Sequence, residues 1–442
     1  MEILISLAII VVLMVVAASK YNFHPFLSLL LAAIAMGFIG GLSESELTNT
    51  LMAGFGKTLG NIGIIIAFGT IIGSYLEKSG GAKTLANWAL KVIGKNRSAL
   101  AMNITGFIVS IPVYCDSGFI ILSSLNKAIS KNTKIPLVVL GVSLAAGLYA
   151  THVFVPPTPG PLAATAALGA DLGLVIILGL IVAIPVSLVG FFWAKYFGRR
   201  IKIETETSKT SISEPKTEKI PSANLAFAPI IVPIVLIALN SIANYPTHPF
   251  GEGNIASIIN FVGNPIIALF VGVFLAFKLK GKITKDTHFN WVTSGLKEAG
   301  IIILITGAGG AFGAILRATG IGDIIGYSFS NLQLGLLLPF IIAAVLKSAQ
   351  GSSTVAIITT AAIIAPILES FGLDSSIGRA LSVLSIGAGA MTVSHLNDSF
   401  FWVVAQFTEI DTATALKTQT VSTLLQGLTG IGIVMVIGWL FI

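Results

Sequence analysis

The sequence is poor in charge and in cysteine. Of its 442 residues, 26 are Lys or Arg and 19 are Asp or Glu, so charged side chains make up 10%, whereas ordinary soluble domains contain roughly 25%. The single cysteine, Cys115, excludes an internal disulfide and a metal site built from several cysteines. Three tracts, 172–194, 253–277 and 418–442, contain no charged residue. Because about 20 apolar residues cross a bilayer core, these tracts exclude a soluble protein, a nucleic-acid-binding protein and a secreted disulfide scaffold.

Motifs that drive chemistry are also missing. No GxxxxGK[ST] sequence is present, so transport driven by ATP is unsupported. The His, Asp and Ser residues match neither an HExxH nor a GxSxG arrangement, which disfavours an enzyme embedded in the membrane. We therefore expect no cofactor and no metal site.

What the sequence does contain is two similar halves, separated by a charged stretch that is typical of a solvated linker. Three segments recur at offsets of 240, 240 and 243 residues: His24-Pro25 with Asn264-Pro265, 76–80 with 316–320, and Thr151-His152 with Ser394-His395. We therefore predict a first repeat at 1–196, a cytoplasmic linker at 197–224 and a second repeat at 225–442.

We predict an all-α integral membrane protein in which each repeat has five spans and one re-entrant hairpin. Because five is an odd number, the second repeat is inverted relative to the first. In each repeat the fourth span is a broken helix. The predicted spans are 3–19, 24–42, 58–76, 135–169 and 172–195, then 225–243, 255–277, 299–317, 377–410 and 418–441; the hairpins are near 98–130 and 332–369.

The distribution of basic residues supports this topology. With the N-terminus outside, 22 of the 26 Lys and Arg residues fall on the inner side, as the positive-inside rule requires. The exceptions are Lys57, Arg317, Lys347 and Arg379. We therefore predict that both termini lie outside.

Four tracts carry polar or helix-breaking residues at membrane depth. They are PVYCDSGF at 112–119, THVFVPPTPGP at 151–161, KSAQGSST at 347–354 and SHLNDSFF at 394–401. Irregular backbone inside a membrane must face protein or a water-filled cavity. Interruptions at corresponding places in two inverted halves indicate a transporter binding site near the midplane.

The breaks favour an anionic substrate. A helix that restarts at a break presents unpaired N–H groups and the positive end of its dipole, which together hold a carboxylate. Lys347 is the only charged residue between 324 and 368, and a substrate carboxylate is one candidate partner for it. The candidate substrate-binding residues are Asp116, Ser117, Gly118, His152, Thr158, Lys347, Gln350, Ser352, Ser353, Thr354, His395 and Asn397.

The candidates for proton coupling are Asp116, Asp398, His152 and His395, since ionisable groups inside a membrane often serve proton relays. Each has a structural alternative. Asp116 would cap a helix that begins near Gly118, Asp398 would cap the helix after it, and the two histidines would be satisfied hydrogen-bonding groups. Lys347 would pair with a hidden carboxylate or a helix C-terminus.

At these motifs the sequence resembles the gluconate:proton symporter (gluconate permease) family of the ion transporter superfamily. The resemblance rests on PVYCDSGFIILSSL, YATHVFVPPTPGPLAA, KSAQGSSTVA and SHLNDSFFWVV and covers essentially the whole chain. It implies proton-coupled uptake of gluconate or a related small hydroxy or sugar acid by a homodimer, with elevator-like alternating access. It also implies a multi-pass protein of the bacterial cytoplasmic (inner) membrane.

Other functions stay open at this point. The string SST at 352–354 is similar in part to the Ser-Asn-Thr signatures of sodium-coupled dicarboxylate relatives, and members of the resembled family handle several hydroxy acids and D-serine. A sodium-coupled carboxylate transporter or a D-serine transporter is therefore an alternative. A channel also uses broken helices, but paired inverted hairpins suit alternating access better. A membrane-embedded enzyme is the remaining alternative.

Overall fold

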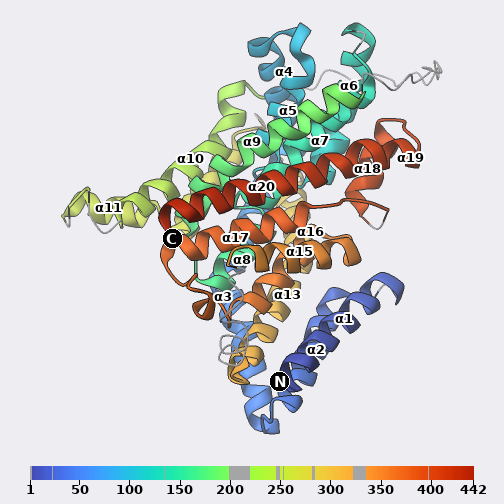
Figure 1. Cartoon of the computed structure of the whole chain (residues 1–442). Helices are drawn as coiled ribbons and strands as arrows, with labels where there is room; N and C mark the ends of the chain where they lie inside the picture. The colour runs from blue at the N-terminus through green and yellow to red at the C-terminus, as the bar shows by residue number, and fades with distance from the viewer. Residues whose placement is uncertain are drawn as a thin grey trace.

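The computed structural model describes residues 2–21, 23–133, 135–198, 220–244, 249–251, 253–280, 284–321, 335–396 and 398–442. Within these residues every regular element is a helix, so the predicted all-α class is confirmed (Figure 1). Six of the described helices are long and apolar enough to cross a membrane, or seven if the bent pair 254–262 and 265–277 counts as one span.

The first half contains nine described α-helices. They are α1 (Glu2–Tyr21), α2 (Pro25–Ile39), α3 (Glu44–Lys78), α4 (Gly81–Ile93), α5 (Ser98–Val109), α6 (Cys115–Thr133), α7 (Leu137–Phe154), α8 (Pro159–Leu168) and α9 (Leu172–Gly198).

The second half follows a similar order after the linker. Its described helices are α10 (Ala223–Ala243), α11 (Asn254–Val262), α12 (Pro265–Phe277), α13 (Lys285–Ala318), α15 (Leu337–Gln350), α16 (Ser353–Ile364), α17 (Ser376–Met391), α18 (Ser399–Phe407), α19 (Thr412–Ala415) and α20 (Val421–Phe441).

The first pair of matching segments proves to be two helix starts of the same kind. His24 and Asn264 are N-caps whose side chains accept a hydrogen bond from the backbone N–H two residues later, at 3.3 Å and 3.0 Å. A proline follows each cap at the first helical position, where its missing N–H costs nothing. The recurring pair therefore begins α2 and α12.

Helices α3 and α13 are longer than the predicted spans at 58–76 and 299–317. A capping box between Ser43 and Glu46 starts α3 fourteen residues before the apolar stretch. Glycines let the two helices approach closely, since a Cβ built on Gly295 would lie 2.9 Å from the Ile71 backbone. Apolar composition indicates only the part that crosses the bilayer, whereas capping and packing extend the helix beyond it.

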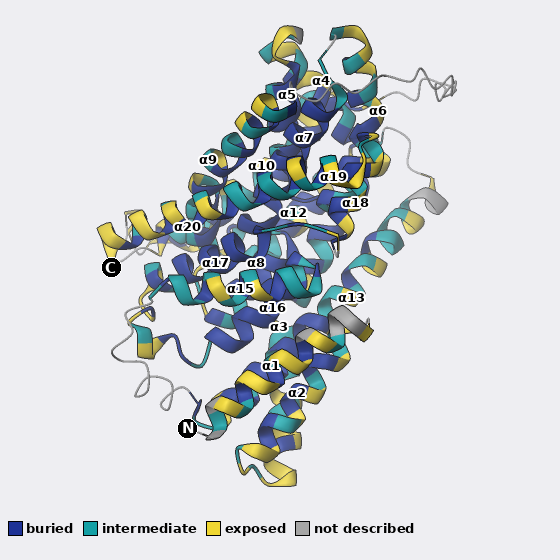
Figure 2. Ribbon diagram, turned by 45° about the vertical axis from the view of Figure 1, so that its right-hand side comes forward, coloured by how far each residue is buried: buried dark blue, intermediate teal, exposed yellow. Residues whose placement is uncertain are grey.

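The most buried helices lie at the centre of the molecule. Every residue of α7 from Val138 to Phe154 is buried, and α16 and α17 are buried along most of their length (Figure 2). Helices at the periphery expose large apolar side chains instead, such as Ile9 on α1 and Trp439 on α20. An apolar outer surface of this kind faces lipid.

The chain leaves the helical path at all four polar tracts. Residues 110–114 separate α5 from α6, and 155–158 separate α7 from α8. Gly351 ends α15 in the left-handed conformation, with φ +77°, and Ser352 caps α16. Between α17 and α18, Val393 has φ +58°, which is strained for a β-branched residue. The four interruptions are separated in sequence but lie on adjoining helices.

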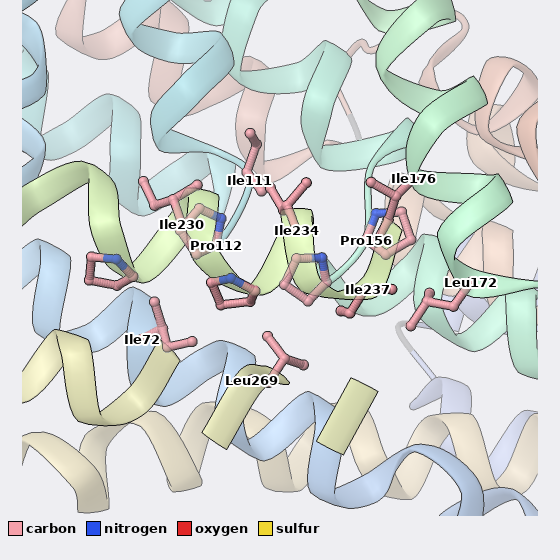
Figure 3. Close-up of a pocket in the computed structure, with 13 residues that line it drawn as sticks. Ile72, Ile111, Pro112, Pro156, Leu172, Ile176, Ile230, Ile234, Ile237 and Leu269 are labelled. Carbon is pink, nitrogen blue, oxygen red and sulfur yellow. The ribbon is translucent and has the colours of Figure 1, made fainter. Parts of the chain in front are cut away.

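Helix α10 packs across the outside of the first two interruptions. The cavity between them is lined by thirteen residues, all of them Ile, Leu or Pro, among them Pro112, Pro156, Ile230 and Leu269 (Figure 3). None of these side chains forms hydrogen bonds, so this cavity does not suit a hydroxylated anion. The polar groups of the two tracts lie elsewhere.

Candidate functional site

A buried ion pair joins the two interruptions of the second half. The Lys347 Nζ atom on α15 lies 2.7 Å from Asp398 Oδ2 at the start of α18, and the two side chains are 1% and 5% exposed. The same carboxylate accepts hydrogen bonds from the Ser394 hydroxyl and, through Oδ1, from the Phe400 N–H at 3.0 Å. Lys347 also donates to the carbonyl of Gly351. Both charges are therefore fully engaged within the protein.

These contacts correspond to the structural alternatives for the two residues. Lys347 pairs with a hidden carboxylate, and Asp398 caps α18. Asp116 differs, because α6 begins at Cys115 and places Asp116 inside the first turn rather than at a cap near Gly118. A carboxylate at that position is favoured by the helix dipole, but one of its oxygens has no partner.

Tyr149 on α7 connects the ion pair to the first half. The centre of its ring lies 5.8 Å from Lys347 Nζ, within the range of a cation–π interaction. Its hydroxyl donates to the Ala390 carbonyl at 3.4 Å and interacts with the Ser353 side chain. Phe400 packs beside Tyr149, with ring centres 5.3 Å apart. The two halves therefore meet at this point.

Three polar groups in the interrupted segments of the first half lack a hydrogen-bond partner among the described residues. They are the buried atoms Asp116 Oδ1, His152 Nδ1 and Tyr114 Oη. Asp116 and His152 both lie within electrostatic range of Lys347 and Asp398. Burying a polar atom without a partner is costly, and such atoms in a native structure point to an unfilled role. Asp116 and His152 therefore lie near the ion pair without a hydrogen bond to it, and the Tyr114 ring lies beside His152, with ring centres 6.0 Å apart.

Four helices begin at this site. Their first residues are Cys115 of α6, Pro159 of α8, Ser353 of α16 and Ser399 of α18. The starts of α8 and α16 touch, since a Cβ built on Gly160 would lie 3.6 Å from Thr354 Cα. The starts of α6 and α18 are linked by Phe119 and Phe400, whose ring centres are 6.1 Å apart. The positive ends of four helix dipoles therefore converge.

The predicted hydroxyl-bearing residues occupy different positions around these starts. Ser352 caps α16 by accepting a hydrogen bond from the Val355 N–H at 3.3 Å. Thr158 is buried and donates to the Val155 carbonyl at 2.6 Å, so it does not cap α8. Ser353 is buried, whereas Ser117 and Thr354 are half-buried. Ser352 is half-buried as well, so these three are the more accessible hydroxyls.

The remaining predicted site residues also differ in their surroundings. Gln350 Oε1 is buried and has no hydrogen-bond partner in the described part of the chain, and His395 Nε2 lies 3.0 Å from the Ser348 carbonyl oxygen. Gly118 is buried against Leu148, where a Cβ would come within 2.8 Å. Asn397 lies outside the described residues.

Tyr114, Tyr149 and Ser394 were not predicted as site residues, although all three lie in or beside the polar tracts. A tyrosine next to a helix break carries both a ring for a cation and a hydroxyl for a ligand, and this signal was available. Within the described residues, no group of three or more His, Cys, Asp or Glu is placed to hold a metal ion.

Comparison with known proteins gives this geometry a context. A family model described as GntP family permease matches residues 1–440. The chain belongs to the GntP permease family. It is similar to a gluconate permease of Pseudomonas aeruginosa, at 33% identity over 424 residues that cover 94% of this chain and 93% of the relative. It is also 33% identical to the D-serine transporter of Escherichia coli K12 over 410 residues, which cover 91% and 90%.

A solved structure shares the fold. The YdaH transporter of Alcanivorax borkumensis matches with a TM-score of 0.64 at 14% sequence identity, over 94% of this chain and 98% of that one. The protein is thus a multi-pass membrane permease and not an enzyme.

Proposed function

We propose that this permease couples proton entry to the uptake of gluconate or a related small hydroxy or sugar acid. The observation that carries the proposal is the convergence of four helix starts on the Lys347–Asp398 pair, beside the unpartnered atoms of Asp116 and His152. Such a site has positive helix ends for a carboxylate and titratable groups for a proton.

The substrate carboxylate would take the place of Asp398 on Lys347. The ammonium group and the N–H groups at the starts of α8, α16 and α18 would then hold it. Pro159 and Pro161 have no N–H, so Gly160 supplies the donor of the first turn of α8. The substrate hydroxyls would be read by Ser117, Thr158, Gln350, Ser352, Ser353, Thr354 and Asn397.

Charge balance explains why a proton would accompany the anion. The Lys347–Asp398 pair is neutral, and an added carboxylate leaves one uncompensated negative charge in a buried site, which is costly. A proton on Asp398 releases Lys347 to the substrate and cancels the negative charge that the substrate adds. Asp116 is the second candidate carrier, because its free oxygen already lies near the pair; His152 and His395 are the others.

We also propose the inverted-repeat topology. The order of elements supports it, since α2 and α3, the pair α5–α6, and α7–α8 correspond to α12 and α13, the pair α15–α16, and α17–α18. Helices α5, α15 and α16 have 12, 14 and 12 residues, fewer than the roughly 20 that cross a bilayer. Short paired helices of this kind suit re-entrant hairpins.

Elevator-like alternating access would move the interrupted helices against the rest of the protein. The contact between α10 and the first two interruptions favours sliding, because its Ile, Leu and Pro side chains form no hydrogen bonds that movement would break. Under this proposal the working unit is a homodimer in a bacterial inner membrane. Crosslinking of the purified permease in liposomes tests the dimer.

D-serine is a second candidate substrate, since a relative at 33% identity is named as its transporter. D-serine shares a carboxylate and a hydroxyl with the hydroxy acids and adds an ammonium group. The free oxygen of Asp116 is a suitable partner for that group. Preference for D-serine over gluconate would therefore depend on Asp116 staying ionised.

Transport in proteoliposomes tests the proposed function. Gluconate should accumulate when the outside is more acidic than the inside, with or without sodium. A counterflow panel of gluconate, glycerate, fructuronate, idonate and D-serine ranks the substrates. Uptake that ignores the pH gradient but follows sodium would replace proton coupling by sodium coupling, and transport without saturation would indicate a channel.

Labelling of single cysteines tests the topology. Cys115 is buried, so cysteines introduced elsewhere report separately. With the termini outside, a cysteine at Lys83 or Lys131 should react only after the cells are permeabilised, whereas one at Ser45 should react in intact cells. The reverse pattern would invert the protein in the membrane.

A further inference from the structure

A second cavity opens at the end of the molecule where basic residues gather. None of the residues that line it belongs to the four interruptions. It lies between the beginning of α5, the beginning of α7 and the end of α9, and its volume is about 520 Å³. Its lining includes the polar residues Asn96, Arg97 and Lys195 and the apolar residues Ile135, Phe191 and Phe192. It shares no residue with the site around Lys347.

The cavity ends at tightly packed helices. Further along α5, the buried Asn103 side chain donates to the Ser143 carbonyl at 2.9 Å and to the Ser187 carbonyl at 3.3 Å. Ser187 donates in return to Asn103 Oδ1 at 2.9 Å. This closed set of hydrogen bonds holds α5 against α7 and α9. The cavity is therefore a feature of the protein surface with a fixed floor.

The charges at the cavity are not neutralised within the described part of the chain. The two ion pairs found there are Lys127–Glu409 and Lys347–Asp398, so Arg97 and Lys195 have no carboxylate partner in it. Next to these cations, Phe192 is 59% exposed on α9 and Phe191 is buried in the wall. A fitting ligand therefore has an anionic group and an apolar tail.

We propose that this cavity binds one anionic phospholipid of the adjoining leaflet. Arg97 and Lys195 hold the phosphate, because guanidinium and ammonium groups at a membrane surface attract anionic head groups. The Asn96 amide donates to the head group, and the acyl chain lies along Phe192. A soluble phosphate ester would leave this apolar wall uncovered, and a zwitterionic lipid would bring a cation toward two others.

Lipid titration of the whole, delipidated permease in a non-ionic detergent tests the proposal. The probes are phosphatidylglycerol, phosphatidylcholine with the same chains, and glycerol 3-phosphate. Phosphatidylglycerol should raise the melting temperature and stay bound in native mass spectrometry, whereas the other two should do neither. Equal stabilisation by phosphatidylcholine would refute anion recognition, and stabilisation by glycerol 3-phosphate would show that the site takes the phosphate alone.

Variants locate the binding. Arg97→Gln or Lys195→Gln should weaken phosphatidylglycerol binding about fivefold each, and the double variant about thirtyfold. Lys91→Gln is the control, because Lys91 is an exposed cation at the same end that does not line the cavity. Arg97→Lys should retain most of the binding. An equal loss of phosphatidylglycerol binding in Lys91→Gln would show that only the general surface charge matters, and would refute a specific site. If the double variant does not fold, the comparison of lipids on the unmodified chain decides.

Discussion

The interruptions of the two halves lie at corresponding places in the order of helices and have opposite chemistry. In the second half the ionisable groups are paired: Lys347 with Asp398, and His395 with a backbone carbonyl. In the first half Asp116 and His152 each retain a buried atom without a partner among the described residues. A buried pair resists change, whereas unpartnered polar atoms accept a ligand or a proton at little cost. The second half thus holds the site together, and the first half adds titratable groups beside Asp398 that have a free atom for a ligand or a proton.

Of the variants considered, removal of Lys347 should have the largest effect on stability and uptake, because it breaks the buried pair of the second half. Lys347→Ala leaves the Asp398 charge buried without its partner, which costs about 3–5 kcal/mol of stability, and it should abolish uptake. Thermal unfolding in detergent and gluconate uptake measure the two effects.

The matched control is the double variant Lys347→Met with Asp398→Asn. It should regain most of the stability, because no unpaired charge remains, but it should not transport. A stable Lys347→Ala protein would show that the pair does not hold the second half together.

Asp116→Asn should separate transport from stability. The change removes a charge with an unpartnered oxygen, so thermal stability should be unchanged or higher. If Asp116 carries the proton, a pH gradient no longer drives accumulation, and the substrate only equilibrates across the membrane while counterflow continues. Uptake along a pH gradient measures this.

The same measurement on Asp398→Asn completes the comparison. Full pH-driven accumulation in Asp116→Asn would show that another group carries the proton, and Asp398 would be the next candidate.

Glycine substitutions on α3 and α13 test how closely these helices pack against the interrupted segments of each half. A Cβ on Gly73 would overlap the carbonyl oxygen of Pro112 at the first interruption, whereas a Cβ on Gly313 would lie 3.2 Å from the Ala362 carbonyl oxygen. Gly73→Ala should therefore cost about 1–3 kcal/mol through overpacking. Gly313→Ala should cost less, since a shift of a few tenths of an ångström relieves it. Equal melting temperatures for the two variants would mean that α3 does not support the first interruption closely.

The two histidines should show the smallest difference. His395→Gln removes the ring nitrogen that lies 3.0 Å from the Ser348 oxygen, at a cost of about 1 kcal/mol. His152→Gln removes no hydrogen bond at Nδ1, so its stability should change less and its pH-driven uptake more. Melting temperatures and uptake of both variants, measured together, check this order. A larger loss of stability in His152→Gln and a larger change of uptake in His395→Gln would contradict the roles that we assign to the two halves.

Several features followed from local sequence. Apolar tracts predicted the helices, and Pro156, Gly351 and their neighbours predicted the places where helices stop, because helix breaking depends on the residue itself and the next few. The starts of α3 and α13 were placed too late, since the stretches before the apolar tracts are held by capping and helix packing. The contact between Tyr149 and Lys347 could not be predicted, because it joins segments that are distant in the sequence.

The sequence by itself determined that this chain lives in a membrane and where its helices are interrupted, since hydrophobicity and helix breaking are properties of short segments. Only the tertiary structure decided how the polar groups at those interruptions are used. Lys347 meets Asp398 while Asp116 and His152 keep free atoms. Pairing depends on which segments fold side by side, and in a low-dielectric interior that choice decides which polar groups have a partner and which do not.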